Sequence, residues 1–418
     1  MERCSRRVSS SAGRVEPRYV EEILVVLAPG GLRPGSLPRT GVAHPGPNLD
    51  ASTIVDPITD VVDLRRHLQW AIEVEHCTIP PYEYAMLSVV DPDSEAATAI
   101  KYVVREEMLH AALAANLLTA VGGTPRFTGD AVPRYPEPMR HHDPEQPLVL
   151  HLAPASVELV RDVFLRIERP EEPGSEPEAD RYETLAQFYE AIVDALGRLG
   201  GEIFTGDPRL QVTKGYAGHG GGALFAITDL DSALLAIDEI VEQGEGTHTS
   251  AGAPVGFDRT RLRHLSLEPF GFEGAPEPAH YWRFLDIAEG RTPLGDVHPM
   301  RLDPSTDDLP EGDLRDLSRL FDACYSLQMD VMERVWRSGD DSPLIDTAMV
   351  PLMNHAEKPI ARALQHEPWP GATGEVAGPP FTWDPMPLDD MRRLARRLAT
   401  TFPLGPTVET LDQVAGVS

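Results

Sequence analysis

The sequence predicts an all-α protein, in which a four-helix bundle carries irregular insertions and is followed by additional C-terminal helices. Three observations favour this fold class. Apolar residues recur at three- and four-residue steps over long stretches, Pro- and Gly-rich segments separate these stretches, and strand-like alternation is not convincing anywhere in the 418 residues. A repeat of fixed period, which would indicate a solenoid, is not found either.

The first predicted helix begins near Asp63, and the second covers about residues 95–121. Gly122 and Gly123 follow the second helix and provide its stop signal. The apolar stripe of the first helix consists of Leu64, Leu68, Ala71, Ile79, Tyr82 and Met86. Glu75 and Glu107 lie inside the two stripes, where a helix normally presents apolar side chains to the core.

The same periodicity predicts further helices at residues 154–168, 181–200, 231–246, 278–290, 313–338, 343–366 and 386–402. The acidic stretch 168–180 and the glycine-rich stretch 215–222 are expected to be loops. We expect three regions: a disordered leader (1–55), the bundle (60–290) and a helical C-terminal extension (313–402) packed on the bundle.

Composition excludes several classes of protein. A formal net charge of −29 and a pI of about 4.8 disfavour nucleic acid and anionic membranes as partners. Three widely spaced cysteines fit a reducing compartment, and no apolar stretch approaches the roughly 20 residues of a membrane span. We therefore expect a cytoplasmic protein, with a homo-oligomer left open. That its partner is a small molecule is implied only by the family resemblance given below.

Several acids and histidines lie where a metal ion would explain them. A carboxylate on the core face of a helix is costly unless it is paired or bound to a metal. Glu107 and His110 stand three residues apart, so on a helix their Cβ atoms lie roughly 5–6 Å apart on one face. The core-side or helix-embedded candidates are Glu75, Glu107, His110, Glu190, Glu242, His280 and, as a further candidate, Glu245. Carboxylate oxygens and imidazole nitrogens suit iron and manganese.

Each candidate has a structural alternative. In this alternative, Glu107 is an acid exposed to water, beside a histidine, His110, whose ring nitrogens have hydrogen-bond partners. Glu242 and Glu245 are then surface acids at the end of a helix interrupted by glycine. We prefer Glu242 over Glu245. By helical angle Glu190 faces away from the apolar side of its helix, so its assignment depends on the family resemblance below.

Other motifs indicate little chemistry. The "GHGGG" stretch (218–222) is not accompanied by a G-x-S-x-G nucleophile elbow, so a hydrolase is disfavoured. No P-loop or G-x-G-x-x-G motif occurs. Tyr281, Trp282 and Phe284 follow His280 directly and are candidates for a substrate pocket, although packing is the alternative for at least two of them.

Five blocks together resemble, in order, the ferritin-like domain of the iminophenylpyruvate dimer synthase family. The resemblance covers roughly residues 60–290. The blocks are "AIEVEHCTIPPYEYAMLSV" (71–89), "VVREEMLHAALAANLLTAVGGTPRF" (103–127), "FYEAI" (188–192), "AIDEIVEQGEG" (236–246) and "HYWRF" (280–284). Members of this family are associated with bacterial secondary metabolism, where the named activity oxidatively couples imines of aromatic amino acids, as in violacein- and rebeccamycin-type pathways.

The resemblance implies a ferritin-like four-helix bundle that holds two iron ions, with manganese or a mixed iron–manganese pair as alternatives. It implies an oxidoreductase that activates O2 to oxidise or couple an amine or imine derived from an amino acid. Two other readings remain open: an iron-binding or storage protein without an organic substrate, and a metal-free interaction module whose acids would be exposed to solvent.

The sequence departs from the usual bundle pattern in the fourth helix. Glu242 and His280 are separated by a long insertion instead of standing three apart, and Glu277 competes with His280 as the ligand that completes the second metal position. Pro278 favours a helix start at this point, so we expect Glu277 to cap the helix and His280 to point its ring into the bundle.

Overall fold

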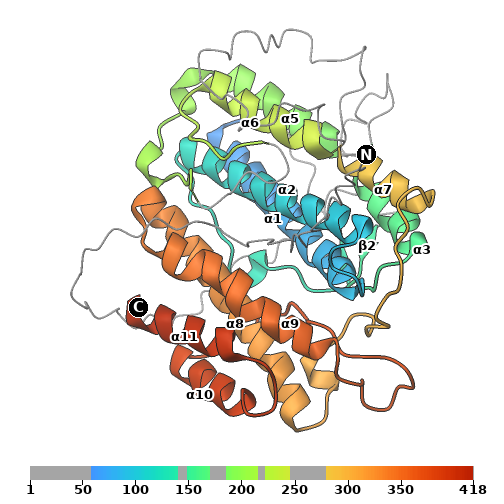
Figure 1. The fold of residues 1–418 in the computed structure, drawn as a ribbon. Helices are drawn as coiled ribbons and strands as arrows, with labels where there is room; N and C mark the ends of the chain where they lie inside the picture. Colours follow the sequence, from blue (N-terminus) through green and yellow to red (C-terminus); the bar gives the residue numbers. More distant parts are fainter. Residues whose placement is uncertain (1–57, 140–147, 170–184, 215–221, 245–278, 418) are drawn as a thin grey trace, which may run out of the picture. The chain divides into compact units, whose positions relative to one another are not determined.

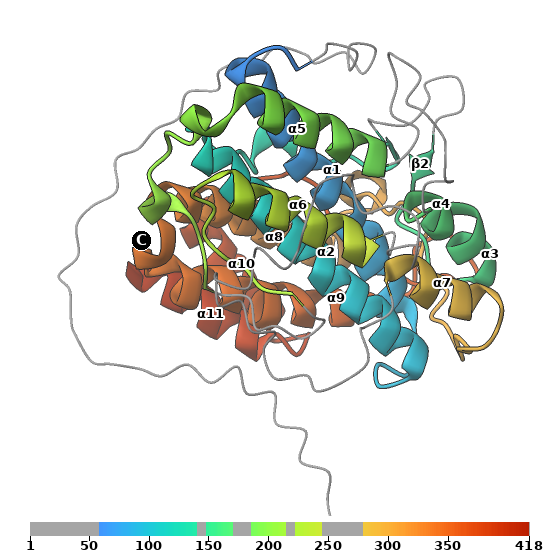
Figure 2. The same cartoon turned by 90° about the horizontal axis from the view of Figure 1, so that it is seen from above.

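The computed structural model describes residues 58–139, 148–169, 185–214, 222–244 and 279–417, all within one compact unit (34–418). Its centre is a pair of long helices that run side by side (Figures 1 and 2), α1 (Val61–Ser88) and α2 (Glu95–Ala120). The Asp60 side chain accepts hydrogen bonds from two amides of the first turn of α1, and the Ser94 hydroxyl accepts one at the start of α2.

Two prolines lie inside α1 without ending it. Pro81 has no amide hydrogen, so the carbonyl of Cys77, four residues earlier, is left without its helical partner. The Tyr135 hydroxyl donates to this carbonyl at 2.7 Å. A side chain from outside the helix thus compensates for the proline, and α1 continues to Ser88.

Two further helices complete a four-helix bundle. α5 (Leu185–Leu199) packs against α1 and α6 (Leu230–Gly244), and α6 packs against α2. The short helix α7 (His280–Ala288) packs against α2, α6 and the segment formed by α3 (Val157–Leu159), the π-helix η2 (Val160–Phe164) and α4 (Leu165–Ile167). The predicted fold class is confirmed.

The C-terminal part of the described chain shares a hydrophobic core with the bundle. Its main helix, α8 (Asp313–Ser338), places Trp336 so that the indole N–H donates to the buried Asn116 of α2 at 3.1 Å. The other helices here are η8 (Ile345–Met349) and η9 (Leu352–Glu357), both π-helical, then α9 (Lys358–Leu364), α10 (Leu388–Leu398) and α11 (Gly405–Val417).

The structure differs from the sequence-based expectation in local details. The stretches predicted as single helices at 154–168 and 343–366 contain π-helical turns, α11 lies beyond the last predicted helix, and a two-residue hairpin pairs β1 (Glu137–Pro138) with β2 (Val149–Leu150). Strands this short are below what a periodicity of two can reveal. Single 3₁₀ turns occur at η1 (Gly129–Ala131), η3 (Gly201–Ile203), η4 (Pro208–Leu210), η6 (Thr306–Asp308) and η7 (Gly339–Asp341).

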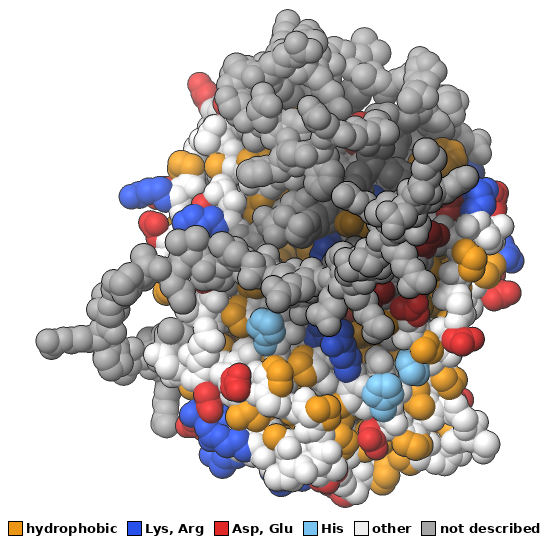
Figure 3. Space-filling view, viewed as in Figure 1, with side chains coloured by type: hydrophobic (Ala, Val, Ile, Leu, Met, Phe, Trp, Pro, Cys, Tyr) orange, Lys and Arg blue, Asp and Glu red, His pale blue; other side chains and the backbone are white. Residues whose placement is uncertain are grey.

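Charged side chains of both signs are scattered over the described part of the face shown in Figure 3. These exposed acids are solvated, which distinguishes them from the carboxylates buried inside the bundle. None of the described helices is long and apolar enough to cross a membrane. The expected leader (1–55) lies outside the described residues.

Candidate metal centre

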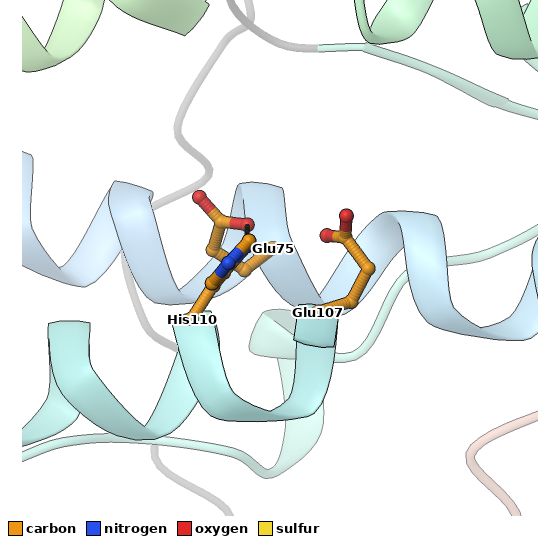
Figure 4. A group of neighbouring side chains, drawn as sticks. All are labelled: Glu75, Glu107 and His110. Atoms are coloured by element: carbon orange, nitrogen blue, oxygen red, sulfur yellow. Dashed lines mark ion pairs between the residues drawn. The ribbon is translucent and has the colours of Figure 1, made fainter. Parts of the chain in front are cut away.

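The helix pair α1 and α2 brings Glu75, Glu107 and His110 together. All three are at most 3% exposed, and each can offer a ligand atom such that all these atoms lie within 4.8 Å of one another. Figure 4 shows Glu75 on α1 and His110 on α2 turned toward each other, with His110 Nδ1 3.5 Å from Glu75 Oε2. Glu107 projects from the same face of α2, one turn away, as the three-residue spacing predicts.

A second group consists of Glu107, Glu168 and His280, whose ligand atoms also lie within 4.8 Å of one another. Glu168 caps the C-terminal end of α4, and His280 is the first residue of α7. The Nδ1 atom of His280 lies 2.9 Å from Glu107 Oε1 and 3.4 Å from Glu168 Oε2. Glu107 therefore belongs to both groups, and the rings of His110 and His280 stack with centroids 5.4 Å apart.

One buried atom shows that these residues fit metal ions. Although His280 Nδ1 lies close to two carboxylate oxygens, it makes no hydrogen bond of acceptable geometry within the described structure. A buried polar atom without a partner is unfavourable, so a site of this kind calls for a bound ion. Three carboxylates and two imidazoles provide the oxygen and nitrogen donors that iron and manganese accept.

Hydrogen bonds fix which nitrogen of each histidine faces the group. The Gln243 side chain donates to Glu239 at 2.6 Å, so its carbonyl oxygen accepts from His110 Nε2 at 2.9 Å. His280 Nε2 lies 3.0 Å from Glu106 Oε2 and donates to that carboxylate. In both rings Nδ1 is consequently the nitrogen directed at the carboxylates, which is the arrangement that outer-sphere partners give to metal-binding histidines.

Each carboxylate of the two groups accepts a hydrogen bond from a hydroxyl group. The pairs are Tyr189 with Glu75 Oε1 at 2.5 Å, Thr78 with Glu107 Oε2 at 2.8 Å, and Tyr82 with Glu168 Oε1 at 2.5 Å. Burial, together with the adjacent glutamates, raises the pKa of Tyr82 and Tyr189 well above the usual value of a phenol, so both remain hydrogen-bond donors.

The electrostatics of the group call for positive charge. Burial and the neighbouring Glu168 raise the pKa of Glu107 to about 7, against the opposing effect of His280. Burial disfavours the imidazolium form of both histidines. The adjacent carboxylates outweigh burial, so the pKa of His110 is raised and that of His280 lies well above its usual value. Divalent cations held by these residues would offset the negative charge of the carboxylates.

Sequence reasoning missed Glu168, which was expected to begin a flexible loop. The structure keeps it in the helical segment, four residues after Phe164 and 2% exposed. The apolar stripe of Val160, Phe164 and Ile167 was visible in the sequence, and a four-residue step from Phe164 reaches Glu168 on the same face. That extension is the signal that would have found this residue.

The structure does not bring Glu190 or Glu242 into either group. Glu190 is exposed, while its neighbour Tyr189 points inward to Glu75. One residue corresponds to a rotation of about 100° around a helix, which explains why the adjacent position faces the other way. Glu242 is half-buried on α6, where Gln243 makes the contact with His110. Glu245 and Glu277 lie outside the described residues.

The three expected pocket residues differ from one another. Phe284 is fully buried, with its ring centroid 5.1 Å from those of Tyr82 and Phe164, so packing is its role in this structure. Tyr281 is half-buried, and Trp282 is 46% exposed. Their rings contact each other edge to face with centroids 5.2 Å apart.

Comparison with known families and curated proteins gives a consistent result. A family model described as ferritin-like matches residues 68–289, more than half of the chain. Dichlorochromopyrrolate synthase of Lentzea aerocolonigenes is 24% identical over 394 residues, which cover 79% of this chain and 37% of that protein. The 2-imino-3-(indol-3-yl)propanoate dimerase of Chromobacterium violaceum is 28% identical over 313 residues, which cover 71% and 28%. The chain thus spans about a third of the length of these relatives.

Among solved structures, the crystal structure of a ferritin-like protein from Caulobacter vibrioides is similar, with a TM-score of 0.50 and 23% identity. The superposition covers 71% of this chain and 94% of that one. At this level of identity the likeness concerns the fold alone.

Proposed function

Because the chain belongs to the ferritin-like family, we propose that it is an oxidising enzyme that uses a pair of non-haem metal ions. The observation that carries the proposal is the sharing of Glu107 by two buried groups, one with Glu75 and His110 and the other with Glu168 and His280. A residue common to two ligand groups is what a dinuclear centre needs. Iron is the proposed metal, with manganese or a mixed pair as alternatives.

Metal ions at these positions would supply the electrons that reduce O2. The chain itself does three things. Its carboxylates balance the charge of the cations, its histidines direct Nδ1 inward, and its buried surroundings limit water at the centre. The burial of Glu75 and Glu107 counts against a metal-free interaction module, which would expose these acids to solvent.

The substrate proposed is an amine or imine derived from an aromatic amino acid. Support comes from the names of the two relatives, one of which is a dimerase of an indole-bearing imine. Tyr281 and Trp282 follow His280 directly, so we assign them as candidate contacts for the aromatic part of the substrate. The proposed reaction is oxidation or coupling within secondary metabolism.

The test is anaerobic loading with iron(II) followed by exposure to O2. We expect close to two iron ions per chain and consumption of O2 that increases when an imine generated from tryptophan or phenylalanine is present. Fewer than half a metal ion per chain after careful loading would overturn the dinuclear site. Iron uptake without a response to any such amine or imine would instead indicate an iron-binding protein without an organic substrate.

A further inference from the structure

We propose that the hydroxyl groups of Thr78, Tyr82 and Tyr189 are positioning groups that decide how each carboxylate binds metal. Each hydroxyl engages one carboxylate oxygen and leaves only the other oxygen for a metal ion. This inference rests on the proposed dinuclear centre and deepens it, because it concerns the mode of coordination and not the presence of metal.

The two oxygens of each carboxylate face different partners. Glu75 Oε1 accepts from Tyr189, and its Oε2 lies 3.5 Å from His110 Nδ1. Glu168 repeats this pattern, with Oε1 accepting from Tyr82 and Oε2 lying 3.4 Å from His280 Nδ1.

Glu107 follows the same pattern. Its Oε2 accepts from Thr78, while its Oε1 lies 2.9 Å from His280 Nδ1. In each of the three carboxylates, the oxygen beside the imidazole is the one that accepts no hydrogen bond from these hydroxyl groups.

A carboxylate oxygen that accepts a hydrogen bond from one of these hydroxyl groups cannot bind a metal ion without weakening that hydrogen bond. Because both partners are buried, water cannot replace the lost bond. We therefore infer that Glu75 and Glu168 bind through one oxygen each.

Thr78 differs from the two tyrosines. Its hydroxyl lies 2.8 Å from Glu107 Oε2 and also 2.8 Å from the backbone carbonyl of Glu75. A hydroxyl has one proton to donate, so Thr78 can release Glu107 and still keep a hydrogen bond through that carbonyl. Glu107, the residue common to both groups, is therefore the carboxylate whose second oxygen is most easily released from its hydroxyl partner.

The test compares Tyr189→Phe and Tyr82→Phe with Tyr84→Phe, a control that removes a buried hydroxyl from α1. The Tyr84 hydroxyl donates to the backbone carbonyl of Arg301 and contacts no carboxylate of the centre. The measurements are iron per chain and the infrared difference spectrum between iron-loaded and iron-free protein. The separation of the antisymmetric and symmetric carboxylate stretches is wide for binding through one oxygen and narrower when both oxygens bind.

We expect wide separations in the wild type and in Tyr84→Phe. In Tyr189→Phe and Tyr82→Phe we expect either a narrower component or the loss of iron that the control retains. Thr78→Val should give the smallest change. Two results would overturn this inference while leaving the dinuclear centre intact. One is a wild type that holds two iron ions but shows narrow separations of the carboxylate stretches. The other is that the wild type and the three Tyr→Phe variants have identical spectra and iron content. A wild type that takes up no iron would overturn the proposed function itself.

Discussion

Two regions that include residues of α1 hold carboxyl groups away from water in different surroundings. At the candidate metal centre, three glutamates lie among two histidines and three hydroxyls, and their ligand atoms converge. The other region contains Glu83 of α1 and Glu357 of η9. Burial raises the pKa of both; Glu83 raises the pKa of Glu357 further, whereas Lys358 opposes the effect of burial on Glu83. Neither of these two glutamates belongs to a group of three potential ligands in the described part of the chain.

The region of Glu83 and Glu357 is a proton-stabilised region, because its carboxyl groups favour the protonated form. Burial raises the pKa of Glu83 to about 7 and that of Glu357 to about 8. Glu357 Oε1 is buried without a hydrogen-bond partner among the described residues. A neutral carboxyl group tolerates such surroundings, whereas a carboxylate does not. The comparison teaches that burial alone does not make a metal site, because convergence of several donors with correctly oriented histidines is also needed.

The largest expected effect comes from removing the residue shared by the two groups. Glu107→Ala should reduce bound iron from about two ions per chain to nearly none, because both positions lose a ligand. Elemental analysis after anaerobic loading measures this, with circular dichroism to check that the helices remain. Glu190→Ala is the matched control and should keep both ions. Retention of both ions by Glu107→Ala would show that the geometry of the two groups has been misinterpreted.

Removing a ligand from only one group should have about half that effect. His280→Ala should lose one iron ion of the two, because His280 belongs only to the group with Glu168. Glu277→Ala should keep both and should cost less than the roughly 1 kcal/mol of a helix cap, because Ala279, and not Glu277 as the sequence suggested, is the N-cap residue of α7. The opposite result, with Glu277→Ala depleted and His280→Ala intact, would move the second metal position to Glu277.

The proton-stabilised region predicts a dependence of stability on pH. Glu357 has a pKa of about 8 in the folded protein and 4.5 as its ordinary value, so between these pH values the folded state binds more protons than the unfolded state. The free energy of unfolding should therefore fall as pH rises from 5 to 8. Glu357→Gln should remove part of this fall and should be more stable than the wild type at pH 8, by on the order of 1–3 kcal/mol.

Urea unfolding of the wild type and Glu357→Gln at several pH values, with both proteins free of metal, checks this prediction. Working without metal removes any contribution of cation binding to the comparison. A stability difference that does not change between pH 5 and pH 8 would mean that Glu357 is already ionised in the folded protein.

The smallest effect concerns a carboxylate that is exposed. Asp60 accepts hydrogen bonds from Val62 N at 2.7 Å and Asp63 N at 3.0 Å and is solvated. Asp60→Ala should lower the free energy of unfolding by about 1 kcal/mol, the usual value of a helix cap, and should leave iron content unchanged. Loss of iron in this variant would mean that the start of α1 controls the centre more than ten residues away.

The fold was largely predictable, because long amphipathic helices have a strong period in the sequence. The apolar stripes predicted both α1 and α2, and the glycines after α2 predicted where it ends. The π-helical turns were not predicted, since they depend on packing and not on local pattern. The 13-residue helix α11 was not predicted either. The division of the chain into leader, bundle and C-terminal extension remains a prediction.

The candidate site was predictable where the candidate ligands lie on regular helices. Glu75, Glu107 and His110 follow from apolar stripes that contain charged residues. His280 was proposed as a helix-embedded candidate and preferred over Glu277 because Pro278 favours a helix start. Glu168 was missed because it stands at the junction of a helix and an acidic stretch. Glu190, which was assigned by resemblance, belongs to neither group and is exposed on α5, where its neighbour Tyr189 is the residue that contacts Glu75.

The most direct measurement is anomalous X-ray diffraction from crystals of the iron-loaded protein, recorded at the iron absorption edge. The account predicts two peaks per chain inside the bundle. One peak should lie beside Glu75 and His110 and the other beside Glu168 and His280, with Glu107 in contact with both. No peak at these positions, or a peak at Glu83 and Glu357 instead, would contradict the assignment of a dinuclear centre to this chain.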